Sequence, residues 1–420
     1  MKNKPDWLLI LLFFLLLIVG WVSIYFTVYQ QGGDFSMDSN YGMQLIWIAS
    51  ALFIGLFVLV IHKRFYYNFA AYIYMFFIAL ILLVFFIGIE RSGAKSWLGI
   101  GGFGIQPAEF AKYGACLLLS RFLSLHSCDL TKWKQVLIAA VIILIPVGLI
   151  LLQNDTGSAI PFLFLIFALF REGLSPWILI VGIATVLLFA LVVYFSQWMI
   201  MVALTVLFLA FIILFYRKRK RFWTLAIVYL CAIGFVFSVD IVYRNVVKEH
   251  QRKRIELLLG KIDDPKGSGF NVNQSMIAIG SGGLLGKGFG EGTQTRLNFV
   301  PEQTTDFIFC TIGEEHGFVG AVLVILLYIF FIWRIIILAE KCDDAFVRSF
   351  GYCIASIFFA HIMINIGMTI GLMPVIGIPL PFISYGGSSL WAFTLMIFTF
   401  LSMSKNKSII NMYGTEDDVQ

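Results

Sequence analysis

Long uninterrupted apolar runs constrain this chain more than any other feature. Residues 8–26, LLILLFFLLLIVGWVSIYF, are about as long as the 20 helical residues that cross a bilayer core. Only helices and closed barrels satisfy every backbone hydrogen bond inside a bilayer, and these runs do not alternate as barrel strands do. With 60% hydrophobic residues, 13% charged residues and a mean hydropathy of +0.92, a water-soluble globule is excluded. The sequence predicts an all-α polytopic membrane protein.

About twelve segments are expected to cross the bilayer. They are residues 7–28, 44–62, 69–89, 107–125, 135–152, 157–171, 176–195, 199–216, 222–245, 306–339, 347–372 and 388–404. The sixth is short and contains Pro161, which indicates a tilted or partly re-entrant segment. The first is too long for a signal peptide and has no small-residue cleavage site, so we interpret it as a span.

Basic residues in short loops predict the orientation. The stretches MKNK, HKRF, TKWK, REGL, RKRKR and SKNKS fall at every second end of the spans, whereas QNDTG and SQWM carry no lysine or arginine. Both termini are therefore expected in the cytoplasm. A large loop, residues 246–305, is expected outside the cytoplasmic membrane together with residues 90–106 and 373–387. We interpret residues 1–420 as one transmembrane domain.

Other features narrow the function classes. The net charge of +6 is explained by topology and by attraction to membrane lipids, and nucleic acid is not needed as a partner. The six cysteines form no CxxC pattern, so neither a metal cluster nor a disulfide is expected. A GK[ST] phosphate loop is also missing, which argues against ATP-driven transport. The glycine-rich part of the large loop carries Lys287 and Arg296, which suit a phosphate or diphosphate; a flexible, solvated loop is the alternative.

Three stretches carry a family resemblance: SGAKSWLGIGGFGIQPAEFAKYG, GSGGLLGKGFGEGTQTRLNFVPEQTTDFIF and GMTIGLMPVIGIPLPFISYGGSSL. They resemble hallmark segments of the SEDS family (shape, elongation, division and sporulation), whose members lie in the bacterial cytoplasmic membrane. Pro379 is similar to the form found in the rod-shape branch of that family. The resemblance implies a peptidoglycan glycosyltransferase that polymerises lipid II on the outer leaflet and works with a class B penicillin-binding protein. It implies ten family spans, so residues 172–245 would hold two extra helices. Thr304 and Ser96 stand where the family usually has His and Arg.

Asp306 matches the aspartate of the family's PExHTDF motif, so the resemblance makes it the expected catalytic base. The donor sugar of lipid II leaves from a diphosphate, which needs charge neutralisation rather than a proton. One carboxylate that takes the proton of the acceptor hydroxyl is therefore enough, whereas a hydrolase of ordinary glycosides needs two. The alternative role of Asp306 is the N-cap of the following helix. No cofactor is required, although assistance by a divalent cation stays open.

The other candidate substrate-binding residues each have a structural alternative. Glu302 could orient the base or be a surface carboxylate. Glu109 and Lys112 could bind the lipid headgroup or form an i,i+3 salt bridge. Glu314 and Glu315 are expected to be structural, His361 and Asn365 to make a helix–helix hydrogen bond, and Asp155 to match an acidic family position or to shape a turn. A lipid II flippase, a septal polymerase and a scaffold are the rival functions.

Overall fold

The computed structural model describes residues 5–28, 36–91, 93–100, 103–215, 219–245, 249–259, 261, 268–297 and 299–405. Within these, ten helices are long and apolar enough to cross a membrane, which confirms the all-α membrane fold class. They are α1 (Trp7–Val28), α2 (Asn40–Val60), α3 (Lys63–Ile87), α5 (Trp133–Leu152), α8 (Pro176–Tyr194), α9 (Gln197–Phe215), α10 (Arg219–Asn245), α14 (Ile308–Glu340), α15 (Ala345–Thr369) and α16 (Gly387–Lys405).

The other two expected spans are shorter helices within the described residues, so the count of twelve stays a prediction. Helix α4 (Pro107–Leu123) has 17 residues, at the lower end of the length that crosses a bilayer. The sixth expected span breaks into α6 (Thr156–Leu163) and α7 (Ile166–Arg171). Pro161 lies inside α6 and has no N–H for the helical ladder, and the helix ends two residues after it.

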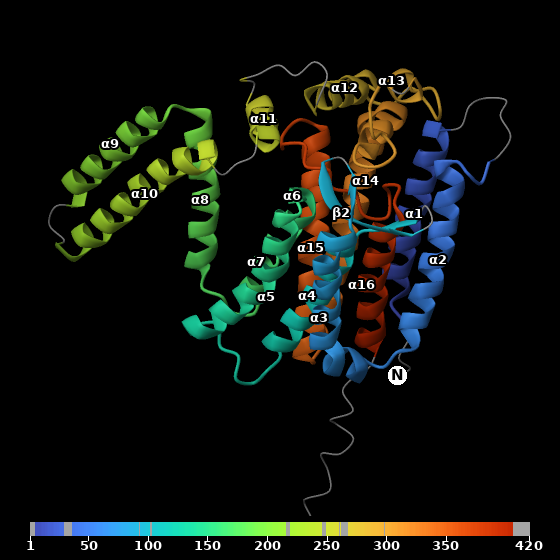
Figure 1. Cartoon of the computed structure of the whole chain (residues 1–420), viewed down its shortest axis with the longest axis horizontal. Coiled ribbons are helices and arrows are strands. Elements are labelled where there is room, and N and C mark those ends of the chain that lie inside the picture. Colours follow the sequence, from blue (N-terminus) through green and yellow to red (C-terminus); the bar gives the residue numbers. More distant parts are fainter. Residues whose placement is uncertain are drawn as a thin grey trace, which may run out of the picture. The chain divides into compact units, whose positions relative to one another are not determined.

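The chain forms two compact units. Residues 1–174 and 270–420 form the first, in which the long helices pack side by side and α13 (Thr293–Arg296) lies across the end where α14 begins, next to α12 (Ser268–Ser281) (Figure 1). Residues 175–269 form the second, which contains α8, α9, α10 and α11 (Glu249–Leu258) around a small core of Val192, Val193, Ile200, Val236 and Val239.

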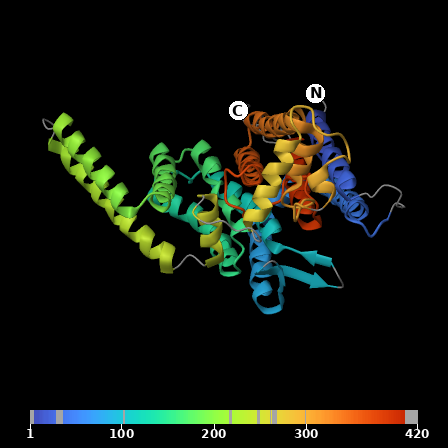
Figure 2. The same ribbon diagram turned by 90° about the horizontal axis from the view of Figure 1, so that it is seen from above.

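The expected outer loop at residues 90–106 forms a small antiparallel sheet. Its strands are β1 (Ile89–Arg91), β2 (Ala94–Ile100) and β3 (Phe103–Ile105), in the order β1-β2-β3, and they stand out from the side of the helix bundle (Figure 2). Ile89 pairs with Trp97, and Leu98 pairs with Ile105. Strands this short give little hydropathy signal, because each offers only a few alternating residues.

Residues 374–386, here called the 374–386 segment, run into the core of the first unit through Phe382. This residue has φ 66°, a left-handed conformation that a bulky side chain rarely adopts. Its ring packs with centroid distances of 5.1–5.9 Å against Phe13, Phe331, Phe358 and Phe393. Gly20 of α1 permits the approach, since a Cβ there would lie 2.6 Å from the Cα atom of Ile383. The packing fixes the segment between helices.

Candidate active site

Asp306 lies just before α14, beside the 374–386 segment. The N-cap residue of α14 is Phe307, whose side chain makes no capping bond, so the alternative that Asp306 is the N-cap is wrong. The N–H of Phe307 donates to the carbonyl of Glu302 (3.1 Å), which closes a turn around the half-buried Asp306. A Cβ added to Gly377 would lie 3.1 Å from Asp306 Oδ2, so the glycine leaves room for the carboxylate.

Two polar side chains of α15 bind backbone carbonyls near Asp306. Asn365 Nδ2 donates to the carbonyl of Asp306 (2.8 Å) and to that of Ile378 (2.7 Å). His361 Nδ1 lies 3.1 Å from the carbonyl of Pro379, and because a carbonyl only accepts, Nδ1 carries the ring proton. The expected helix–helix hydrogen bond is confirmed for His361, which also bonds Lys112 of helix α4 (Pro107–Leu123). It is wrong for Asn365, whose two bonds go to carbonyls in irregular segments.

The charged pair at the start of α4 is fully buried. Lys112 Nζ lies 2.7 Å from Glu109 Oε1 and 2.8 Å from His361 Nε2, which accepts because the ring proton is on Nδ1. Lys112 is 0% exposed and Glu109 2% exposed. The internal salt bridge, one of the two roles expected for this pair, is therefore confirmed. Binding of a lipid headgroup stays a prediction.

The glycine-rich loop, residues 282–290, pairs with a break in α14. Gly317 has φ 63° and ψ −161°, which interrupts the helix and frees carbonyls of the preceding turn. Two loop amides donate to these carbonyls: the N–H of Lys287 to Glu314 O and the N–H of Gly288 to Glu315 O, each at 3.0 Å. We call this pairing the loop–helix junction. Its amides are used within the protein rather than offered to a ligand.

The Glu314 carboxylate completes the junction. It is 0% exposed and accepts hydrogen bonds from Lys287 Nζ (2.7 Å), from the N–H of Gln294 (2.9 Å) and from both the N–H (2.9 Å) and the hydroxyl (2.8 Å) of Thr295. Glu314 is thus structural, as expected. Lys287 forms an ion pair there, although 25% of its side chain is exposed.

The remaining expected site residues lie near the same end of the molecule. Arg296 is exposed at the end of α13. Glu302 is exposed, has φ 55°, and accepts a hydrogen bond from the Thr305 hydroxyl (2.8 Å), so it shapes the turn that leads to Asp306. The described residues contain no group of three or more His, Cys, Asp or Glu side chains that could hold a metal ion, and the six cysteines are free thiols.

Asp155 is the N-cap of α6, close to the 374–386 segment. Its Oδ1 accepts from the N–H of Ser158 (3.0 Å), and its Oδ2 accepts from Gln106 Nε2 (2.8 Å). A Cβ added to Gly157 would lie 2.6 Å from the carbonyl of Ile376, so α6 touches the segment directly. Asp155 therefore shapes the turn, and Gln106 is a partner that the sequence analysis did not include.

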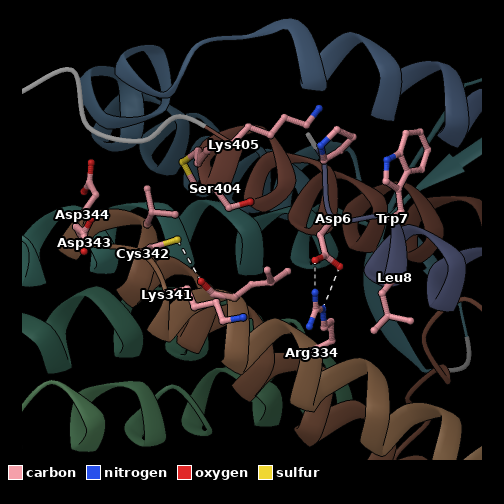
Figure 3. Close-up of a pocket in the computed structure, with 14 residues that line it drawn as sticks. Asp6, Trp7, Leu8, Arg334, Lys341, Cys342, Asp343, Asp344, Ser404 and Lys405 are labelled. Atoms are coloured by element: carbon pink, nitrogen blue, oxygen red, sulfur yellow. Dashed lines mark hydrogen bonds and ion pairs between the residues drawn. The ribbon is translucent and has the colours of Figure 1, made fainter. Parts of the chain in front are cut away.

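A cavity of about 450 Å³ lies at the opposite end of α14 (Figure 3). Asp6 and Arg334 face each other across it, and Arg334 Nε donates to Asp6 Oδ1 (3.0 Å). Lys341 and Lys405 also line it. Burial alone would raise the pKa of Asp6, but its bonds to Arg334 and to the N–H of Leu9 hold this pKa below its ordinary value of 3.8. None of the expected site residues lines this cavity.

Comparison with known proteins identifies relatives over nearly the whole chain. The family model "Cell cycle protein" (FtsW, RodA, SpoVE) matches residues 6–205 and 200–409. "Peptidoglycan glycosyltransferase RodA" of Treponema pallidum is 34% identical over 96% of this chain and 97% of its own length. "Peptidoglycan glycosyltransferase MrdB" of Escherichia coli K12 is 35% identical over 82% of this chain and 80% of its own length.

Solved structures share the fold. One titled "Structural coordination of polymerization and crosslinking by a peptidoglycan synthase complex" aligns with a TM-score of 0.69 and 24% identity, covering 96% of this chain and 98% of that one. The rod shape determining protein RodA of Thermus thermophilus aligns with a TM-score of 0.62 and 23% identity, covering 96% and 97%.

Proposed function

Because this chain belongs to the family of cell cycle proteins that includes FtsW, RodA and SpoVE, we propose that it polymerises lipid II into glycan strands for cell elongation and rod shape. Family membership makes it a multi-pass membrane protein and a peptidoglycan glycosyltransferase. The proposal adds the substrate, the cellular role and an active site on the extracytoplasmic face, with both termini in the cytoplasm. The observation that carries it is the half-buried Asp306, placed at one end of the bundle on a fixed backbone.

Asp306 is the catalytic base of this proposal. When the acceptor hydroxyl attacks the anomeric carbon of the donor, its proton passes to the Asp306 carboxylate while the bond from that carbon to the diphosphate breaks. The departing diphosphate takes the electron pair and needs only charge neutralisation, so no general acid is required. Gly377 supports this role, because it leaves the approach to Asp306 Oδ2 free of a side chain on that side.

Two basic residues, Arg296 and Lys287, are the proposed cations that neutralise the diphosphate. Arg296 is exposed and can reach a ligand without breaking any contact described above, whereas Lys287 would have to share its charge with Glu314. Glu109 and Lys112 bind substrate only if α4 and α15 separate, since both side chains are buried. Glu302 supports the turn before Asp306 and would contact substrate through its exposed carboxylate.

The elongation role is supported by the names of relatives. Those named RodA and MrdB are 34% and 35% identical, and two named FtsW are 29% and 30% identical. A class B penicillin-binding protein is the proposed partner. The fold match to a chain in a structure titled as a peptidoglycan synthase complex that polymerises and cross-links supports a cross-linking enzyme as partner.

Purified protein supplied with fluorescent lipid II in liposomes tests the activity. We expect glycan chains that a muramidase degrades. Movement of lipid II between leaflets without polymer would instead make the chain a flippase, and neither product would make it a scaffold. Depletion in cells tests the role: rounded cells support elongation, and filaments with failed septa would assign a septal role.

A further inference from the structure

We propose that Asn365 and Ser384 are positioning residues that hold the Asp306 carboxylate in its reactive place, an inference that rests on the proposed catalytic role of Asp306. Neither side chain needs to touch the substrate. Both act on the backbone of the turn that carries Asp306, and together with one N–H of the 374–386 segment they form what we call the carbonyl clamp.

The clamp binds three consecutive carbonyls. They are Thr304 O, which accepts from the N–H of Tyr385 (2.9 Å), Thr305 O, which accepts from Ser384 Oγ (2.5 Å), and Asp306 O, which accepts from Asn365 Nδ2 (2.8 Å). Each carbonyl lies in its own peptide plane, so the three bonds hold the planes 304–305, 305–306 and 306–307. The last two planes meet at the Cα atom of Asp306 and set the direction of its Cα–Cβ bond.

Asn365 is suited to this task by the chemistry of its amide. Its Nδ2 faces two carbonyl oxygens, of Asp306 and of Ile378, and both can only accept, so the two N–H groups must point to them. The residue is 0% exposed, and its buried Oδ1 has no hydrogen-bond partner among the described residues. Its two N–H donors are therefore the groups through which this side chain acts on the turn.

Ser384 ties the same turn to the 374–386 segment from the other side. Its hydroxyl donates to Thr305 O and accepts from the N–H of Leu380 (2.8 Å), and it is 4% exposed. The segment itself is anchored in the aromatic core through Phe382. The clamp therefore connects the base to this aromatic core. Its loss would let the carboxylate move, and a displacement near 1 Å can cost about 10²-fold in rate.

The test compares kcat and KM of four variants with purified protein and lipid II. Asn365→Ala and Ser384→Ala are expected to lower kcat about 10²-fold while KM stays within about twofold, because only the placement of the base changes. Ser384→Thr keeps the hydroxyl and should retain most of the parental kcat. Tyr74→Phe is the matched control: it also removes a buried side-chain bond to a backbone carbonyl, that of Ile142 (3.0 Å), but far from the turn.

Parental kcat in both alanine variants would overturn the clamp, as would a rise in KM alone or an equal loss in Tyr74→Phe. If Asn365→Ala does not fold, as judged by its melting temperature, Ser384→Ala decides the matter. Asp306→Asn, measured alongside, distinguishes failure of the clamp from failure of the proposed function. Full activity in Asp306→Asn overturns the catalytic role of Asp306. An inactive Asp306→Asn together with fully active clamp variants overturns only the clamp.

Discussion

Asp306 lies one residue before the N-cap of α14, which is Phe307. Its carbonyl is bound by Asn365. The backbone of the residue is thus fixed while its carboxylate lies beside a glycine. This fixed placement is what the proposed role of Asp306 as a base requires.

Asp306→Asn is expected to lower the polymerisation rate by about 10²–10⁴-fold, which is the usual contribution of a general base. The amide has nearly the same shape, so the melting temperature should stay close to that of the parent. The measurement is glycan synthesis from lipid II by purified protein, with thermal melting as the control for folding. Near-normal chain synthesis by the variant would refute the assignment.

The two loop cations are expected to differ. Lys287→Gln should lower the melting temperature, because the fully buried Glu314 loses its only ion-pair partner among the described residues, and such losses cost several kcal/mol. Arg296→Gln should leave stability unchanged and should lower kcat more than it raises KM, if the charge acts on the departing diphosphate. Thermal melts and saturation kinetics check both. Equal melting temperatures for the two variants would contradict the structural role of Lys287.

The candidate site was predictable from sequence only in part. Asp306 could be singled out because its motif is local. Asn365 could not be assigned its role, because its acceptors are backbone carbonyls 59 and 13 positions away. Every residue has a backbone carbonyl, so the sequence does not show which ones a side chain will bind. The partner of Glu314 was not predictable either: the sequence offered Lys287 a diphosphate or solvent as its partner, whereas the folded chain pairs it with Glu314.

At the scale of elements, α14 is a long helix that depends on its break. Gly317 adopts a conformation that only glycine tolerates, and a Cβ there would lie 2.3 Å from the amide nitrogen of Gly286. Hydropathy predicted residues 306–339 as one span, close to the observed Ile308–Glu340. It could not locate the break, since a single glycine in an apolar run is also compatible with a continuous helix.

Gly317→Ala is expected to destabilise the protein by about 1–3 kcal/mol or more, because backbone strain and the clash with Gly286 add. Gly148→Ala in α5 is the matched control: that glycine is helical, and a Cβ there meets nothing within 4 Å, so the substitution should be neutral or stabilising. The two melting temperatures in the same detergent give the comparison. Similar values for both variants would contradict the loop–helix junction.

The far end of α14 is attached to α1 by the Asp6–Arg334 pair. Asp6→Asn is expected to cost about 1–2 kcal/mol at neutral pH, between the values for exposed and buried pairs. Because folding lowers the pKa of Asp6, its contribution is fully present above about 3.8 and is lost as the pH falls through the pKa of the folded chain. Melting temperatures of parent and variant should therefore converge in acid. A difference that is constant with pH would refute the ion pair.

At the scale of the whole molecule, the proposed orientation places the two ends of α14 on opposite sides of the membrane. In a variant without the six native cysteines, a cysteine at the exposed Glu291 should react with an impermeant maleimide in intact cells. One at the exposed Lys132 should react only after the cells are opened. Labelling in the reverse pattern would invert the topology and place Asp306 in the cytoplasm.

The loop–helix junction also imposes an order of events while the chain is being made. The ribosome completes residues 282–290 before it reaches Glu314, so the amides that the broken helix needs already exist when α14 emerges. If the loop were retained on the wrong side of the membrane during insertion, the carbonyls of Glu314 and Glu315 would lack these partners, and the break at Gly317 could not be supported. Translocation of the loop is thereby a condition for completing the loop–helix junction in each newly synthesised molecule.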